Sequence, residues 1–135
     1  MELLIEFPGG ARVDAHVGPF TIETDQPPDD TAPSPFTLFL ASLGTCAGIY
    51  ALRFCRQRGI ATDGMSIVER VHASPSGMVE RIELDIRLPA GFPEKYREAV
   101  LRATDLCTVK KHLEQPPEIV TTASFSKSAE PIPVG

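Results

Sequence analysis

The chain has 135 residues, of which 42% are hydrophobic and 23% are charged. This composition is typical of one folded domain and argues against extended disorder. The 13 Lys and Arg residues are outnumbered by 18 Asp and Glu residues, and the resulting net charge of -5 disfavours binding to nucleic acid. We expect a single domain over residues 1–126 and a frayed tail over residues 127–135.

Short strands are predicted at the beginning of the chain. Residues 2–7, 11–17 and 20–24 are rich in apolar and β-branched side chains, and residues 11–17 alternate apolar and polar side chains. The segments Pro8–Gly10 and Gly18–Pro19 separate the three strands and are typical of tight turns. This pattern predicts an antiparallel meander of three strands.

A long helix is predicted from Ser34 to Arg58. Ser34 is a favourable N-cap, proline is tolerated at the first helical position, and Gly59 provides a stop. The uncharged stretch over residues 31–52 is long enough for a transmembrane segment, but prolines and glycines interrupt it. We therefore expect no membrane span. The first half of the helix is apolar on nearly all sides, which predicts burial between sheets or between subunits.

The second half of the chain mixes strands and helices. Residues 65–73 and 79–88 are predicted to form a hairpin, because apolar and charged side chains alternate in the second segment. An amphipathic helix over residues 93–106 follows, with Tyr96, Val100 and Ala103 on its inner face, and then a short helix over 108–113. A last strand is predicted over residues 118–126. The complete order of elements defines an α+β fold.

The chain has three cysteines, and an odd number without regular spacing argues against a secreted disulfide scaffold. Residues 1–6 lack the basic residues of a signal peptide, so we expect a cytoplasmic protein with reduced thiols. Cys46 lies among small residues that leave room for a second group, although a buried free cysteine is often only a packing residue. Cys107 is predicted at a helix start, where the thiolate is favoured.

The third cysteine, Cys55, is predicted on the opposite face of the long helix from Cys46. Nine positions correspond to about two and a half helical turns, so these two cysteines do not pair within the helix. If Cys46 has a partner in the same chain, that partner is Cys107. The three histidines, His16, His72 and His112, have no metal-ligand spacing, and no phosphate-binding glycine motif occurs. We therefore expect no metal and no cofactor.

Three segments of the sequence resemble the OsmC/Ohr superfamily of osmotically inducible and organic hydroperoxide resistance proteins, in particular its OsmC-like branch. They are Pro33–Pro35, LFLASLGTCAG over residues 38–48 and DLCTVKKHL over residues 105–113. The first two match the beginning of the family's cysteine-bearing helix, and the third matches the segment of its second cysteine. The loop segment Asp25–Pro28 also fits the family pattern, and the resemblance covers residues 3–124.

This resemblance implies an intertwined homodimer, with antiparallel sheets wrapped around central helices and active sites at the dimer interface. It implies that Cys46 attacks a peroxide and becomes a sulfenic acid, and that Cys107 resolves it as a disulfide. A thiol reductant of the dihydrolipoamide type would then restore both thiols. The implied function is a thiol-dependent peroxidase that acts on organic hydroperoxides or hydrogen peroxide.

The sequence departs from the family pattern beside both cysteines. The family's first helical turn carries a glutamate that pairs with an arginine, whereas Phe36 and Thr37 occupy this turn here, and Thr108 replaces the usual proline after the second cysteine. Arg12, on an early strand, is the candidate cation that activates the first cysteine, and Arg53 is the alternative.

The missing glutamate leaves other functions open. One alternative is a dimeric protein that binds a small apolar ligand, with its cysteines used for packing. Another is a redox sensor that passes oxidation to a partner protein without repeated turnover.

Overall fold

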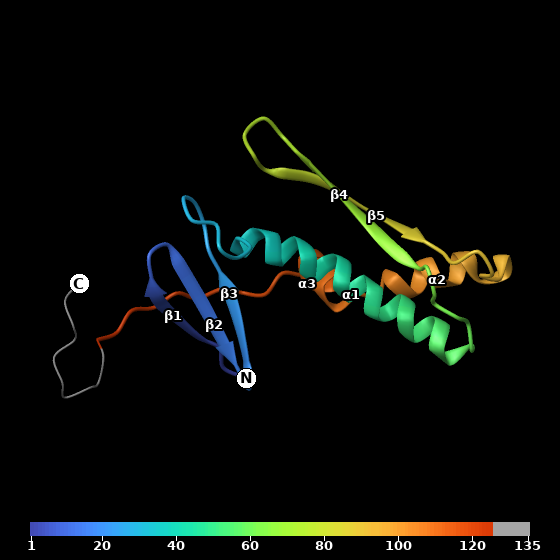
Figure 1. Cartoon of the computed structure of the whole chain (residues 1–135), viewed down its shortest axis with the longest axis horizontal. Coiled ribbons are helices and arrows are strands. Elements are labelled where there is room, and N and C mark those ends of the chain that lie inside the picture. The colour runs from blue at the N-terminus through green and yellow to red at the C-terminus, as the bar shows by residue number, and fades with distance from the viewer. Residues whose placement is uncertain (126–135) are drawn as a thin grey trace.

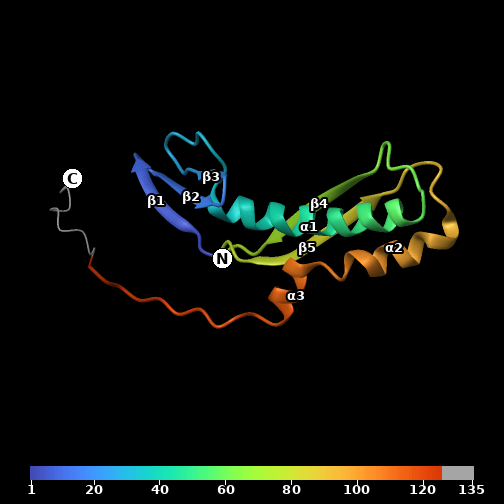
Figure 2. The ribbon, with the colours of Figure 1, turned by 90° about the horizontal axis from the view of Figure 1, so that it is seen from below.

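The computed structural model describes residues 1–125 of the chain. A long helix, α1 (Pro35–Gln57), runs through the middle of the molecule, and the other elements are placed around it (Figure 1). A three-stranded sheet lies at the N-terminal end of α1, and a two-stranded hairpin runs alongside the helix itself. Two short helices near the C-terminal end of the chain pack against another side of α1 (Figure 2). The fold is α+β, as predicted.

The N-terminal sheet is the predicted meander. Its strands are antiparallel in the order β1-β2-β3, with bounds β1 (Leu4–Gly9), β2 (Arg12–Val17) and β3 (Phe20–Thr24). Gly10 and Gly18 have φ angles of 59° and 53°, which side chains with a Cβ rarely adopt, so glycine permits both tight turns. The register places Asp14 opposite Glu23, and the hydroxyl of Thr24 donates to the carbonyl of Val13.

Local sequence signals explain both ends of α1. The Ser34 side chain accepts a hydrogen bond from the backbone N–H of Thr37, and Pro35 occupies the first turn. Gly59 has a φ of 64° and ends the helix as predicted. One face of α1 is buried, and most of its residues follow one another at intervals of three to four positions. They are Leu43, Ala47, Ala51, Phe54 and Cys55.

The predicted hairpin is present as β4 (Ser66–Ala73) and β5 (Val79–Arg87), which pair antiparallel. Strand β4 packs against α1 at two glycines that permit a close approach. The Ile67 side chain lies 3.8 Å from the place of a Cβ on Gly48, and the Glu69 carboxylate lies still closer to the corresponding place on Gly44. Burial raises the pKa of Glu69, and a hydrogen bond from the Gly44 backbone acts in the opposite direction.

The main core joins α1 to α2 (Arg97–Thr104), which follows the single 3-10 turn η1 (Glu94–Tyr96). Val100 of α2 is fully buried against Ala51, Phe54 and Cys55 of α1. The predicted inward residues Tyr96 and Ala103 also pack on this cluster. The chain then turns at Cys107 into α3 (Thr108–Glu114), so the core holds the segment that carries Cys107 close to α1.

The predicted strand over residues 118–126 is wrong for the residues described. Residues 118–125 form no strand, and Ile119 and Val120 are 85% and 72% exposed. A strand requires a neighbour with free N–H and C=O groups, and this segment runs past the N-terminal sheet without joining it (Figure 2). Ser126 and the predicted tail over residues 127–135 lie outside the described part of the chain.

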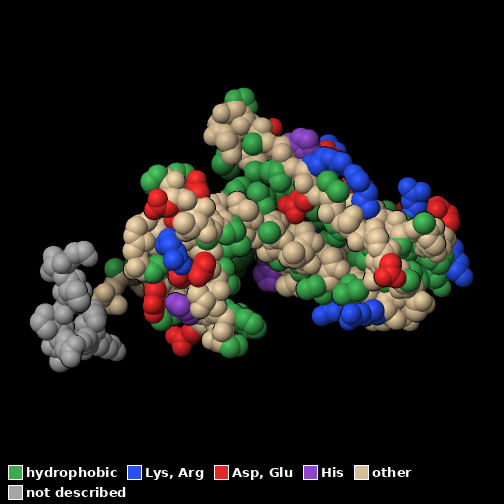
Figure 3. Space-filling view, in the orientation of Figure 1, with side chains coloured by type: hydrophobic (Ala, Val, Ile, Leu, Met, Phe, Trp, Pro, Cys, Tyr) green, Lys and Arg blue, Asp and Glu red, His purple; other side chains and the backbone are tan. Residues whose placement is uncertain are grey.

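The predicted burial of α1 between sheets is not seen within the single chain, while its burial between subunits stays a prediction. Phe36, Phe39 and Ile49 are 52%, 37% and 49% exposed. Hydrophobic side chains lie open along the middle of the molecule, between the N-terminal sheet and the hairpin (Figure 3). Among the described residues, α1 is the one helix long and apolar enough to cross a membrane, and 28% of its most apolar window is buried. One chain of this size covers only one face of the helix.

Candidate active site

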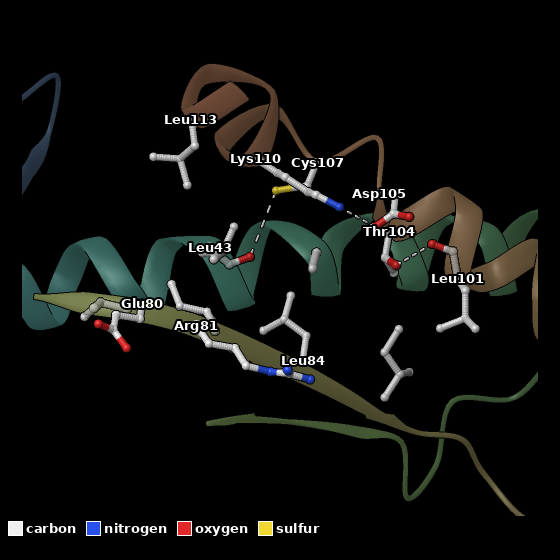
Figure 4. Close-up of a pocket in the computed structure, with 14 residues that line it drawn as sticks. Leu43, Glu80, Arg81, Leu84, Leu101, Thr104, Asp105, Cys107, Lys110 and Leu113 are labelled. Carbon is white, nitrogen blue, oxygen red and sulfur yellow. Dashed lines mark hydrogen bonds and ion pairs between the residues drawn. The ribbon is translucent and has the colours of Figure 1, made fainter. Parts of the chain in front are cut away.

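The structure brings the side chains of Cys46 and Cys107 close enough for each thiol to affect the pKa of the other. Cys46 is half-buried in α1, whereas Cys107 is 1% exposed and forms the N-cap of α3. The Cys107 thiol also points toward the carbonyl oxygen of Leu43, with a sulfur–oxygen distance of 4.0 Å (Figure 4). Cys55 lies in the core cluster, away from this pair, as its helical spacing predicted.

Several hydrogen bonds hold the segment of Cys107 in place. The backbone N–H of Cys107 donates to the carbonyl of Thr104, and the Cys107 carbonyl accepts from Lys111. The hydroxyls of Tyr50 on α1 and Thr108 on α3 are 3.1 Å apart and join the two helices beside the cysteines. No helical or strand periodicity indicated this last contact, because the two residues are far apart in sequence.

The surroundings of Cys46 favour its thiolate. Burial raises the pKa of this thiol, but hydrogen bonds from the backbone N–H groups of Val109 and Thr108 and from the Cys107 thiol lower it. The charge of Arg53 lowers it further. The stabilising interactions outweigh burial, so the pKa of Cys46 lies below the usual range for cysteine. A lowered pKa increases the fraction of thiolate, the nucleophilic form of cysteine, at a given pH.

The pKa values of the other two cysteines are raised rather than lowered. Burial raises the pKa of Cys107, and its hydrogen bond to Cys46 together with the charge on Cys46 raises it further. Burial also raises the pKa of Cys55, although the charge of Arg58 partly opposes this. The two neighbouring thiols therefore differ: the pKa of Cys46 is lowered and that of Cys107 is raised.

Two arginines were candidates for the cation that activates Cys46, and the structure places them differently. Arg53 lies on α1, its charge lowers the pKa of Cys46, and its guanidinium lies 5.6 Å from the centre of the Tyr50 ring. Arg12 lies in the N-terminal sheet, where it forms ion pairs with Asp14 at 3.2 Å and Glu23 at 3.4 Å. Within residues 1–125 of one chain, the contacts of Arg12 are in that sheet rather than at the cysteine pair.

No acidic residue lies in the first turn of α1. Phe36 is exposed, and its ring stacks on Phe39 with 5.6 Å between ring centres. Thr37 bonds with the side chain of the N-cap Ser34. Both residues that replace the glutamate therefore have local structural roles and offer no carboxylate for an arginine.

A pocket of about 580 Å³ opens beside Cys107, between α1, β5, α2 and α3 (Figure 4). Most of its wall is apolar and includes Leu43, Leu84 and Leu101. Lys110 lies at its edge and pairs with Asp105 at 2.7 Å. A pocket of this kind fits the apolar part of a small organic molecule and places it near the sulfur of Cys107, whereas Cys46 does not line the pocket.

The histidines lie in three separate places. His16 pairs with Glu6 within the N-terminal sheet, His72 pairs with Glu83 within the hairpin, and His112 bonds to the carbonyl of Thr108. Residues 1–125 contain no group of three or more metal-ligating side chains.

The fold and the paired cysteines define a small α+β protein with a dithiol site. Residues 28–122 match the family described as OsmC-like protein, and the chain belongs to this family. No match is found among proteins of curated function.

Solved structures share the fold at low sequence identity. An OsmC-like protein from Mycoplasma pneumoniae is 17% identical with a TM-score of 0.65, covering 85% of this chain and 87% of its own. A putative osmotic stress induced and detoxification response protein from Psychrobacter arcticus is 22% identical with a TM-score of 0.64, and the coverages are 81% and 85%. The organic hydroperoxide resistance protein OhrB of Bacillus subtilis is 18% identical with a TM-score of 0.56, and the coverages are 86% and 93%.

Proposed function

We propose that this protein is a thiol-dependent peroxidase that reduces organic hydroperoxides, and hydrogen peroxide as a smaller substrate. The observation that carries the proposal is the pair formed by Cys46, whose thiolate is stabilised, and the protonated thiol of Cys107 beside it. Similarity in fold to organic hydroperoxide resistance proteins supports the same reaction class. The apolar pocket next to Cys107 supports a substrate with an organic substituent.

The reaction follows from the two protonation states. The Cys46 thiolate attacks one peroxide oxygen, the O–O bond breaks, and the leaving alkoxide takes a proton to become an alcohol. Cys46 is then a sulfenic acid. The Cys107 thiol attacks that sulfur, water leaves, and a disulfide forms. Two thiol groups of an external reductant, such as a dihydrolipoamide-type dithiol, return the disulfide to two thiols. No further cofactor takes part in these steps.

A homodimer is part of the proposal. The exposed apolar side of α1, with Phe36, Phe39 and Ile49, is a surface that a second copy would cover. Arg53 is proposed as the cation that acts on Cys46 within one chain. Arg12 is proposed to contribute from the second copy, because its place in the N-terminal sheet lies outside the cysteine pair of its own chain. We expect the dimer to function in the cytoplasm, where the thiols stay reduced.

The proposal is tested by adding one equivalent of cumene hydroperoxide to the reduced full-length protein and mapping the thiols by mass spectrometry. A disulfide between Cys46 and Cys107 should form within seconds, while Cys55 stays free and serves as an internal control. Cys46→Ser should abolish peroxide consumption. Cys107→Ser should leave a sulfenic acid on Cys46 that dimedone traps, and should lose turnover with reductant.

The same experiment separates the peroxidase from its alternatives. Unchanged thiols in the wild-type protein, or equal peroxide consumption by Cys46→Ser, would exclude the peroxidase. A small ligand retained in the apolar pocket would then favour a binding protein, which the missing first-turn glutamate also favours. Oxidation of one equivalent without further cycles in the presence of reductant would favour a redox sensor.

A further inference from the structure

The hydroxyl groups of Tyr50 and Thr108 meet directly beside the cysteine pair. Tyr50 follows Cys46 by one helical turn on α1, and Thr108 follows Cys107 and begins α3. The two oxygen atoms are 3.1 Å apart, within ordinary hydrogen-bond distance. Among residues 1–125, this is the one side-chain hydrogen bond between α1 and α3 that does not involve sulfur. It therefore links the two elements that carry the two cysteines.

Thr108 also takes part in the stabilisation of Cys46 through its backbone. Hydrogen bonding from the N–H groups of Thr108 and Val109 contributes to the lowered pKa of Cys46. A side-chain bond that holds Thr108 therefore also holds both donors at the distance where they favour the thiolate. A proline at position 108 would remove the hydroxyl and one of these N–H donors together.

Tyr50 interacts with the cation as well. The guanidinium of Arg53 lies over the Tyr50 ring, 5.6 Å from its centre, and the charge of Arg53 lowers the pKa of Cys46. Tyr50 thus contacts α3 through its hydroxyl and Arg53 through its ring. These two contacts are chemically separable, because replacing tyrosine with phenylalanine removes the first and keeps an aromatic ring for the second.

We propose that Tyr50 and Thr108 are positioning residues for the Cys46 thiolate, acting through the hydrogen bond between their hydroxyls. This bond keeps the first turn of α3 seated on Cys46, and with it the N–H donors and the Cys107 thiol. The proposal deepens the proposed peroxidase function and rests on it for the effect on peroxide reduction. Its effect on the ionisation of Cys46 is independent of any peroxide chemistry.

The test measures the rate at which iodoacetamide alkylates Cys46 as a function of pH, residue by residue, by mass spectrometry of the full chain. Tyr50→Phe and Thr108→Val should each move the Cys46 profile to higher pH and lower the rate near neutral pH by about 2- to 10-fold, the range expected for one lost hydrogen bond. Thr108→Ser keeps a hydroxyl and should restore the wild-type profile to within about twofold.

The matched control is Thr45→Val. Thr45 is next to Cys46, but its hydroxyl donates to the carbonyl of Ala41 within α1 and leaves α3 untouched. This variant should retain the wild-type profile. The double variant with Tyr50→Phe and Thr108→Val should lose no more than either single variant, because both remove the same bond. Circular dichroism of each variant establishes that the helices are intact.

Wild-type profiles in both Tyr50→Phe and Thr108→Val would overturn the proposal, as would additive losses in the double variant. The failure of the proposed function is seen separately. If peroxide forms no disulfide in the wild-type protein while the variants still shift the alkylation profile, then the positioning role stands and the peroxidase does not.

Discussion

Replacing Val100 with alanine should destabilise the protein more than the size of the change suggests. Val100 is fully buried at the junction of α1 and α2, where it contacts the cluster of Ala51, Phe54 and Cys55. The substitution removes two methyl groups, which are worth about 1.6 kcal/mol in transfer from water. The cavity left in a core fixed by two packed helices raises the expected loss in the free energy of unfolding to about 2–3 kcal/mol.

The assay is thermal and urea unfolding at one fixed protein concentration, because association with a second copy changes the apparent stability. For a chain of this length we expect the unfolding midpoint of Val100→Ala to fall by about 6–12 °C. Val71→Ala is the matched control, since it removes the same two groups from a side chain that is 40% exposed. It should cost about 1 kcal/mol or less. Equal losses at the two sites would refute this account of the core.

Two further predictions concern the cysteine site and its supporting strand. At neutral pH iodoacetamide should modify Cys46 before Cys107 and Cys55, because the pKa of Cys46 is lowered and the other two are raised. The rate at which iodoacetamide modifies Cys46 should decline as the pH falls through the pKa of Cys46. Arg53→Gln should shift this pH profile to higher pH, because it removes a positive charge that lowers that pKa. Faster labelling of Cys107 would contradict the assignment. Gly44→Ala should leave thermal stability unchanged or raise it, because alanine favours helices by about 1 kcal/mol and the new Cβ meets only the carboxylate end of the Glu69 side chain, which can rotate away. A clear loss of stability that Glu69→Ala restores would show instead that this carboxylate is fixed in place.

The elements with local signals were predictable from the sequence. The cap at Ser34, the stop at Gly59 and the alternating residues of the hairpin each depend on neighbours within a few positions. The inner face of α2 was predicted for the same reason, since helical periodicity identifies Val100 directly. Each of these features could be predicted because it depends on a backbone conformation or a helix or strand face that a single short segment of sequence determines.

Features that depend on distant segments were not predictable in this way. The sequence left open whether Cys107 lies near Cys46, and only the resemblance to a family implied it. No sequence pattern indicated the contact of Tyr50 with Thr108, because both residue types are common on helix surfaces. The two residues meet only because the turn at Cys107 places α3 against α1. The strand expected over residues 118–126 is absent from residues 118–125, because the composition of a segment does not by itself supply a hydrogen-bonding neighbour.

The hydrogen bonds onto Cys46 also affect the redox energetics of the pair. They stabilise the reduced form alone, because a sulfur atom bonded to Cys107 carries no charge and is a poor acceptor for the N–H groups of Thr108 and Val109. Stabilising the thiolate relative to the disulfide raises the reduction potential of the couple. If the proposed reaction forms a disulfide between Cys46 and Cys107, these interactions make it easier to reduce than the same disulfide without them. In the proposed reaction, the turn between α2 and α3 would thus both lower the pKa of Cys46 and favour the return of its thiol.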